Sequence, residues 1–345
     1  MDKNLKSFDK HNMEKLLKEF PQQCVNAYSI NVPLPKEKNF NKICFSGMGG
    51  SAIGGDILKI FVEKKSSLPF YVHRDYELPN FADEKTLLIV TSYSGNTEET
   101  ISAYNKGKKN RCIIWVLTSG GKLLNLAEKN SEPFIKIPSG FPPRCALGYL
   151  FFPCFNLLKN LKIISKDISF SFFTKMREKV KIFSERKNNL AEKIANKFYN
   201  KIPIIYSGNL FYPAILRWKT QIAENSKSFA FINVFPEMNH NEIMAWHFPK
   251  NFIDKTIPVF ILSSEYNDRI KKRMEFTKKI VSKIHPEILV IETEGNTLIE
   301  KIFNLIILGD WISYYLSLLN HIDPTEIPEI ELLKKFLQKR RKNEK

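Results

Sequence analysis

Short runs of apolar residues alternate with longer amphipathic stretches along most of the chain. In the first half, the runs have the length and composition of buried strands, and they comprise residues 42–46, 69–73, 86–91, 112–117 and 133–137. Helical patterns follow most of them, at residues 51–63, 97–108 and 121–130, and an apolar helical run closes this half at 144–160. Strands that alternate with helices predict parallel βαβ units, so we expect a doubly wound sheet covered on both faces.

The second half repeats this pattern. Residues 174–199 form a long Lys-rich amphipathic stretch without Gly or Pro, which predicts one helix that opens a second domain. The predicted strands that follow are 202–207, 229–234, 258–264 and 287–292, and the predicted helices are 211–226, 267–284, 297–320 and 328–341.

Two strand sequences of the first half have counterparts in the second, in the same order. ICFSG (43–47) is echoed by IIYSG (204–208), and LLIVTS (87–92) by PVFILS (258–263). This order predicts two copies of one α/β unit, with domains at residues 1–160 and 161–345.

Composition and charge exclude several classes of protein. The chain has 345 residues and a net charge of +17, and much of the excess lies in residues 171–201 and 334–345. There the charges interleave with apolar residues at helical spacing, which is typical of solvated helix faces. A basic surface that attracts anionic substrates is the alternative. No recognised nucleic-acid-binding module is present, so we expect no nucleic-acid partner.

Membrane insertion and secretion are not predicted either. We find no uncharged apolar stretch of about 18 residues and no apolar signal segment near the N-terminus. The five cysteines are scattered and have no CxxC spacing, so neither a disulfide framework nor a zinc site is expected. This pattern fits a reducing cytoplasm.

Two predicted loops have the composition of ligand-binding turns. SGMGGSAIGGD (46–56), which contains Gly50 and Ser51, follows a strand and opens a helix. It matches neither the dinucleotide fingerprint nor a Walker A loop, and a tight structural turn is the alternative. TSYSGNTEET (91–100) offers the hydroxyls of Ser92, Ser94 and Thr97 and contains no lysine. A plain capping box is its alternative, but both loops follow parallel strands, where ligands bind in such sheets.

Three charged or titratable residues outside these loops are further candidates. Arg144 follows two prolines and heads an apolar helical run, which favours an anionic target over a surface ion pair. Glu224 precedes the predicted strand 229–234, and His240 follows it between two asparagines, as expected for a turn. A helix-capping role is the alternative for His240. No second histidine lies at metal-ligand spacing, so we expect no metal.

Taken together, these segments resemble a known family. GMGGSAIGGD, SYSGNTEET, PPRCALGY, QIAENSK and EMNHNE occur in this order, and LGDWISYYLSLLNHIDPTEIPEIELLK (308–334) ends the series. The chain is similar over residues 40–337 to the bifunctional phosphoglucose/phosphomannose isomerases, which are built from two sugar-isomerase (SIS) domains. The resemblance implies an α/β fold of two doubly wound SIS-type domains.

The resemblance also implies site residues and roles. Substrate binding would fall to Gly50, Ser51, Ser92, Ser94, Thr97 and Arg144. Glu224 would be the base that forms the enediol, and His240 would open the sugar ring and donate a proton. Lys334 matches the closing lysine of the family pattern, although a shift of one residue would select Lys335. The basic end, 338–345, departs from the family pattern and says nothing about chemistry.

The implied activity interconverts glucose 6-phosphate or mannose 6-phosphate with fructose 6-phosphate. This chemistry needs one base, an acid/base pair and a cation near the enediolate oxygen, but no redox cofactor and no obligatory metal. The resemblance further implies a homodimer in which His240 serves the partner's active site. Two alternatives remain. A non-catalytic sugar-phosphate-binding regulator would keep the serine loop alone, and an aminotransferase half would need a glutaminase domain with an N-terminal cysteine.

Overall fold

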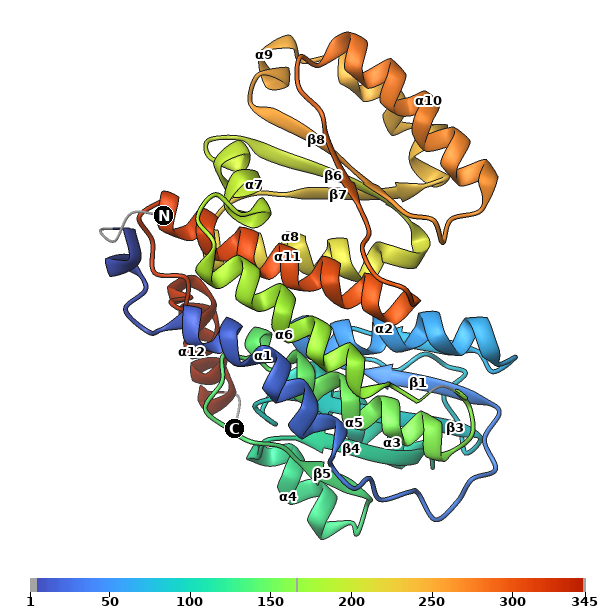
Figure 1. Ribbon diagram of the computed structural model, residues 1–345. Coiled ribbons are helices and arrows are strands. Elements are labelled where there is room, and N and C mark those ends of the chain that lie inside the picture. Colours follow the sequence, from blue (N-terminus) through green and yellow to red (C-terminus); the bar gives the residue numbers. More distant parts are fainter. Residues whose placement is uncertain (1–4, 166, 344–345) are drawn as a thin grey trace.

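The computed structural model describes residues 5–165 and 167–343. These residues form two parallel β-sheets and the helices that pack on them (Figure 1). The first sheet has the order β2-β1-β3-β4-β5, with strands Phe70–His73, Lys42–Ser46, Thr86–Ser92, Ile113–Thr118 and Phe134–Lys136. The second has the order β7-β6-β8-β9, with strands Phe231–Phe235, Ile202–Gly208, Thr256–Leu262 and Leu289–Glu292. The second order repeats β2-β1-β3-β4. Because β6 and β8 take the places of β1 and β3, the predicted internal repeat is confirmed.

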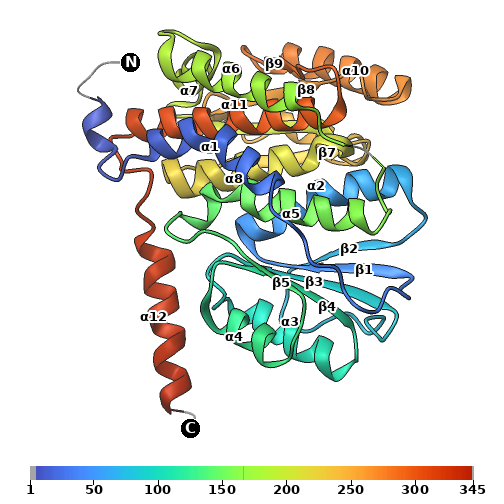
Figure 2. The ribbon, with the colours of Figure 1, turned by 60° about the horizontal axis from the view of Figure 1, so that its bottom comes forward.

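Helices form three layers around the sheets. The central layer, between the sheets in Figures 1 and 2, contains α1 (Met13–Tyr28), α2 (Gly49–Lys65), α5 (Leu147–Asn160), α6 (Phe170–Glu185), α8 (Tyr212–Ser226) and α11 (Leu298–Leu319). The outer face of the first sheet carries α3 (Glu98–Lys109) and α4 (Gly121–Lys129), and that of the second carries α10 (Asp268–Ile284). Two shorter helices are α7 (Leu190–Phe198) and α9 (Lys250–Ile253), and α12 (Pro328–Asn343) extends away from the body (Figure 2).

Strand β3 illustrates how the sheet separates two apolar layers. Leu87 and Ile89 pack in the large core that contains the central helices, whereas Leu88 and Val90 pack against α3 and α4. All four side chains are buried. This two-residue alternation with both faces covered explains why the parallel strands are continuous apolar runs in the sequence.

The Lys-rich stretch 174–199 contains two helices, so the prediction of a single helix was wrong. Helix α6 ends at Glu185, and Asn188 adopts a left-handed conformation with a φ of 54°. The side chain of Asn189 then accepts a hydrogen bond from the Glu192 N–H and caps α7. Asparagine tolerates the left-handed backbone of Asn188 and is a preferred N-cap residue, as at Asn189. The Asn-Asn pair therefore separates the two helices, although the segment contains neither Gly nor Pro.

Two other elements differ from the sequence-based expectations. Helix α1 was not predicted, although its buried residues recur at helical spacing: Met13, Leu17, Phe20, Cys24 and Ala27. In addition, Arg144 does not begin the apolar helix. It lies in a separate 3-10 turn, Pro143–Cys145, and α5 begins at Leu147.

One helix bears on the expectation about membrane-spanning segments. Helix α11, Leu298–Leu319, is long and apolar enough to cross a membrane by length and composition alone. The criterion of an uncharged run missed it because Asp310 interrupts the apolar sequence. Of its most apolar window, 89% is buried inside the protein, as expected for the core helix that packs against α7 and α8.

Candidate active site

The loops that follow β1 and β3 lie in contact. Thr91 at the end of β3 donates from Oγ1 to the carbonyls of Ser46 and Ser51, at 3.1 and 3.3 Å. The Tyr93 N–H donates to Ser51 Oγ at 3.3 Å. The structure therefore brings the two glycine- and serine-containing loops together at the carboxyl edge of the first sheet, where open α/β sheets bind ligands.

The three hydroxyl residues of the serine loop have different surroundings. Ser92 is buried, and its Oγ lies 2.9 Å from Thr97 Oγ1 and accepts from the Gly95 N–H at 3.1 Å. Ser94 is exposed, and its Oγ accepts from the Asn96 N–H at 3.3 Å. Thr97 precedes α3 but makes no side-chain capping bond. The loop is therefore not a plain capping box: Ser92 and Thr97 brace it, and Ser94 faces solvent.

Glycine permits a close backbone contact at Gly50 and a left-handed turn at Gly95. A Cβ on Gly50 would lie 3.1 Å from the Pro143 carbonyl oxygen and 3.2 Å from Arg144 Cα. Gly95 has a φ of 67°, and a Cβ there would lie 1.7 Å from the Gly120 carbonyl oxygen. Gly50 thus allows the turn that carries Arg144 to pack directly on the start of α2.

Arg144 is the centre of the site, and only 3% of its surface is exposed. Its Nε donates to Asn225 Oδ1 at 2.6 Å, and its Nη2 donates to the carbonyls of Pro324 and Thr325 at 2.6 and 3.1 Å. Its Nη1 lies 3.3 Å from Glu224 Oε2. Three fixed acceptors therefore orient the guanidinium so that Nη1 faces the carboxylate.

Glu224 lies near the end of α8 and is less buried than Arg144, with 28% of its side chain exposed. The next residue, Asn225, is fully buried and links the site to α11, because its Nδ2 donates to Ser313 Oγ at 2.9 Å. A carboxylate that contacts both solvent and an arginine can accept a proton from a bound ligand.

A buried ion pair between Arg217 and Asp310 stabilises the backbone of Arg144. Arg217 on α8 donates from Nε and Nη2 to the two carboxylate oxygens of Asp310 on α11, at 2.9 and 2.8 Å. The same Nη2 donates to the Arg144 carbonyl oxygen at 2.9 Å. This two-pronged geometry is the one in which arginine binds carboxylate most specifically, and it fixes the backbone of Arg144 relative to α8 and α11.

Sequence reasoning missed a second cation at the site. Lys227 follows α8 with a φ of 52°, and its Nζ donates to the Asp323 carbonyl at 2.9 Å. Burial, followed by the positive charge of Arg144, lowers the pKa of Lys227. Its place directly after ENS in the QIAENSK motif was the available signal. The loop 323–325, whose carbonyls accept from both cations, had no such signal.

The structure places His240 away from Glu224. Glu224 lies just before β7, and His240 ends a 3-10 turn, Glu237–His240, just after it. The five-residue strand between them spans about 16 Å at 3.3 Å per residue. His240 is exposed, which excludes a core position.

The segment that carries His240 is anchored on both sides. Glu242 accepts hydrogen bonds from the Tyr206 hydroxyl on β6 at 2.8 Å and from Asn233 Nδ2 on β7 at 2.5 Å. Asn239 donates to Thr277 Oγ1 on α10 at 2.7 Å. The Asn and Glu residues of the NHNE motif therefore hold the turn while the imidazole remains exposed.

Lys334 and Lys335 both lie on α12 and are exposed. Neither joins the described residues around Arg144 by a hydrogen bond or an ion pair. The structure thus does not decide between the two lysines. The side chains of the basic end, 338–345, lie outside the described residues.

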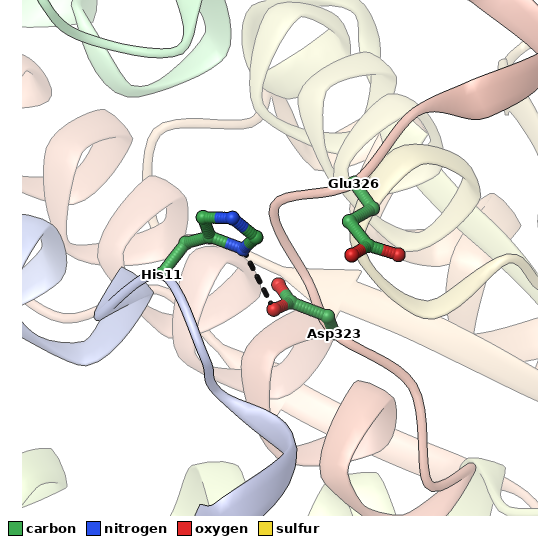
Figure 3. Close-up of side chains that lie close together, drawn as sticks. All are labelled: His11, Asp323 and Glu326. Carbon is green, nitrogen blue, oxygen red and sulfur yellow. Dashed lines mark hydrogen bonds and ion pairs between the residues drawn. The ribbon is translucent and has the colours of Figure 1, made fainter.

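One group of side chains among the described residues has the arrangement of metal ligands. The ligand atoms of His11, Asp323 and Glu326 lie within 4.8 Å of one another. Figure 3 shows how the three side chains lie. However, Asp323 already accepts from the Thr325 N–H through Oδ1, and from the Lys10 N–H and His11 Nδ1 through Oδ2. These three side chains therefore form a cluster in which hydrogen bonds engage both oxygens of Asp323.

Comparisons with known proteins show the family of this chain. Residues 187–337 match the family described as bacterial phospho-glucose isomerase C-terminal SIS domain. A bifunctional phosphoglucose/phosphomannose isomerase of Caldicellulosiruptor bescii is 40% identical, over 92% of this chain and 96% of its own length. The chain belongs to the bifunctional phosphoglucose/phosphomannose isomerase family. The resemblance inferred from the sequence motifs is therefore confirmed.

Two further similarities bear on fold and specificity. A D-glucosamine-6-phosphate 4-epimerase of Sulfolobus acidocaldarius is 30% identical over 74% of this chain and 78% of its own length. A solved structure, described as a hypothetical protein of Thermus thermophilus, has a TM-score of 0.72 at 14% identity and covers 98% of this chain and 92% of that one. The latter likeness confirms the α/β fold with two parallel sheets. The former shows that relatives of this isomerase family include a protein named for a different reaction.

Proposed function

We propose that this protein is an aldose–ketose isomerase that interconverts glucose 6-phosphate and mannose 6-phosphate with fructose 6-phosphate through a cis-enediol. The observation that carries the proposal is the contact between Arg144 and Glu224. Gly50 packs on the turn of Arg144, and the next residue, Ser51, accepts from the Tyr93 N–H of the serine loop. The contact between Arg144 and Glu224 would bring a base and a cation to the same small ligand. The similarity to named phosphoglucose/phosphomannose isomerases supports the same substrates.

In the proposed reaction, Glu224 removes the proton from C2 of the open-chain aldose while the C1 carbonyl oxygen gains a proton, which gives the enediol. Glu224 then returns its proton to C1 as the C2 hydroxyl gives its proton back to the acid that protonated the C1 oxygen, which gives the ketose and restores both groups. Arg144 Nη1, 3.3 Å from the carboxylate, is placed to stabilise negative charge on the C1 and C2 oxygens. Both C2 epimers can form when rotation about the C2–C3 bond presents either face of the planar enediol to this one base.

The phosphate group of the substrate is assigned to the serine loop. Ser94 presents an exposed hydroxyl in the loop that precedes α3. Gly50 and Ser51 lie in the first turn of α2, which follows the neighbouring strand β1. Helix N-termini favour anions because their first N–H groups have no helical acceptor. Neither segment 46–56 nor segment 91–100 contains lysine, so hydroxyl and amide groups would carry this recognition.

We also propose a homodimer with shared active sites, in which His240 and the C-terminal lysine (Lys334 or Lys335) open the sugar ring. Two apolar surfaces support a second copy as the partner. Helix α12 extends away from the body (Figure 2) and exposes five large apolar side chains. The edge strand β7 exposes Phe231, which stacks on the exposed Phe229 with ring centroids 6.4 Å apart. The α12 residues are Ile330, Leu332, Leu333, Phe336 and Leu337. Contiguous exposed apolar groups of this kind mark interaction surfaces.

Two coarser assignments accompany this proposal. The division into domains 1–160 and 161–345 is supported by the repeated strand order, although α1 packs against both α5 and α6 and so crosses the division. A cytoplasmic location is supported by the five cysteines, all of which are free and buried.

The experiment is a coupled assay that starts from fructose 6-phosphate and reports glucose 6-phosphate and mannose 6-phosphate separately. We expect both aldoses to form. Binding of the sugar phosphate without turnover would instead support the regulator, and conversion of glucosamine 6-phosphate alone would support an epimerase. Either result would overturn the proposed function.

A further inference from the structure

The loop that holds Arg144 is itself held by one carboxylate. Asp323 is 7% exposed, and each of its side-chain oxygens is engaged. Oδ1 accepts from the Thr325 N–H at 2.7 Å, which closes the loop on itself, whereas Oδ2 accepts from the Lys10 N–H at 3.1 Å and lies 2.8 Å from His11 Nδ1. The loop is thereby fastened to the N-terminal segment that precedes α1 (Figure 3).

This fastening sets the direction of three successive carbonyl groups. The Asp323 carbonyl accepts from Lys227, and the Pro324 and Thr325 carbonyls accept from Arg144 Nη2. A guanidinium has five N–H donors in a rigid plane, so fixing Nε and Nη2 leaves no freedom for Nη1. Through the loop, Asp323 determines where Nη1 lies relative to Glu224.

The surroundings of Asp323 favour the ionised form of its carboxyl group. Burial alone would raise its pKa, but the hydrogen bonds from the Thr325 N–H, His11 and the Lys10 N–H, together with the charge of His11, outweigh burial and hold the pKa below its ordinary value. An ionised carboxylate accepts these N–H bonds more strongly than a neutral group does.

We propose that Asp323 is a positioning residue for the isomerisation, which acts through loop 323–325 to aim Arg144 at the reacting oxygens. The inference rests on the proposed function. Asp323 does not touch the substrate, and the chemical step depends on it only because a displaced guanidinium would no longer meet the charge that forms in the enediolate.

The test is a double-mutant cycle on kcat for fructose 6-phosphate, with Asp323→Ala, Arg144→Lys and the combined variant. Misplacing a catalytic group by about 1 Å costs on the order of 10²-fold in rate, so we expect a loss of that size in Asp323→Ala with KM changed less than about 3-fold. In the Arg144→Lys background, the same substitution should cost less than about 3-fold, because Lys cannot use the two carbonyls in the same way.

Two further variants keep the test decisive. Asp323→Asn retains the bond from the Thr325 N–H but loses an acceptor for the Lys10 N–H, so its kcat should lie between those of the Ala variant and the unaltered protein. Lys10→Ala is the matched control, because only the backbone N–H of Lys10 contacts Asp323. Equal losses from Asp323 substitution in both backgrounds would overturn the inference alone. Absence of turnover in the unaltered protein would overturn the proposed function and the inference with it.

Discussion

Arg144 Nη1 and Glu224 Oε2 lie 3.3 Å apart, although the two residues are separated by 80 positions in the sequence. The first half of the chain supplies the cation and the second half supplies the carboxylate, and they meet within the central layer of helices. The packing of α2 and α8 against each other brings the two halves together at this point.

The first prediction concerns Glu224. Glu224→Gln preserves the shape of the side chain and removes the base, so kcat should fall by at least ~10²-fold. The substitution should also abolish exchange of the C1/C2 proton with solvent, measured by NMR in D₂O. Glu63→Gln is the control, since Glu63 is an exposed carboxylate on α2 that pairs with Lys59. Solvent exchange at the normal rate in Glu224→Gln would exclude Glu224 as the base.

The second prediction separates the serines of the phosphate loop. Ser94→Ala should raise KM for fructose 6-phosphate with little change in kcat or thermal stability, because a phosphate contact persists from the ground state to the transition state. Ser92→Ala should instead lower the free energy of unfolding by about 1 kcal/mol, since it removes the acceptor for the Gly95 N–H. An unchanged KM in Ser94→Ala would show that Ser94 does not bind the substrate phosphate.

The third prediction concerns stability at acid pH. His73 is buried at the end of β2, and burial lowers its pKa below the ordinary value of 6.5 despite the opposing influence of Asp75. Below about pH 6.5 the unfolded chain binds a proton that the folded chain resists, so the stabilisation present above that pH is lost as the pH falls toward the folded-state pKa.

The loss should approach about 1.4 kcal/mol per pH unit. His73→Gln cannot titrate, so urea unfolding between pH 6.5 and 5 should show a shallower pH dependence than in the unaltered protein. The exposed His247→Gln provides the comparison. Parallel pH profiles for the unaltered protein and His73→Gln would show that His73 does not contribute.

The sequence predicted the parts of the fold that depend on local pattern. Buried strands such as β3 are continuous apolar runs, and the loops after β1 and β3 carry the Gly and Ser residues that their turns require. The break at Asn188–Asn189 was missed because it needs only asparagine's tolerance of left-handed backbone, which no Gly or Pro announces.

The candidate site divides in the same way. Glu224 and His240 lie in motifs that can be recognised from the sequence. The groups that orient Arg144 cannot be recognised in this way. The Asp323 carboxylate accepts from the backbone N–H of Thr325, and the Pro324 and Thr325 carbonyls accept from Arg144 at a separation of about 180 residues. Carbonyl acceptors carry no residue signature, so only the folded structure can show them.

The last prediction tests the shared active site. Glu224 lies on α8 before β7 and His240 follows β7, so in the proposed dimer His240 would serve the site of the neighbouring subunit. Glu224→Gln and His240→Ala homodimers should each be nearly inactive. After subunit exchange, a heterodimer contains one site with both native residues, so its activity should approach half that of the unaltered dimer. The two-fold dimer required for this arrangement is the commonest symmetry of soluble oligomers.

Leu333→Asp on the exposed face of α12 should prevent this recovery by weakening dimerisation, measured by light scattering, whereas Glu331→Gln on the same helix should not. If mixtures with verified subunit exchange stay inactive, both residues act within one chain and the shared site is wrong.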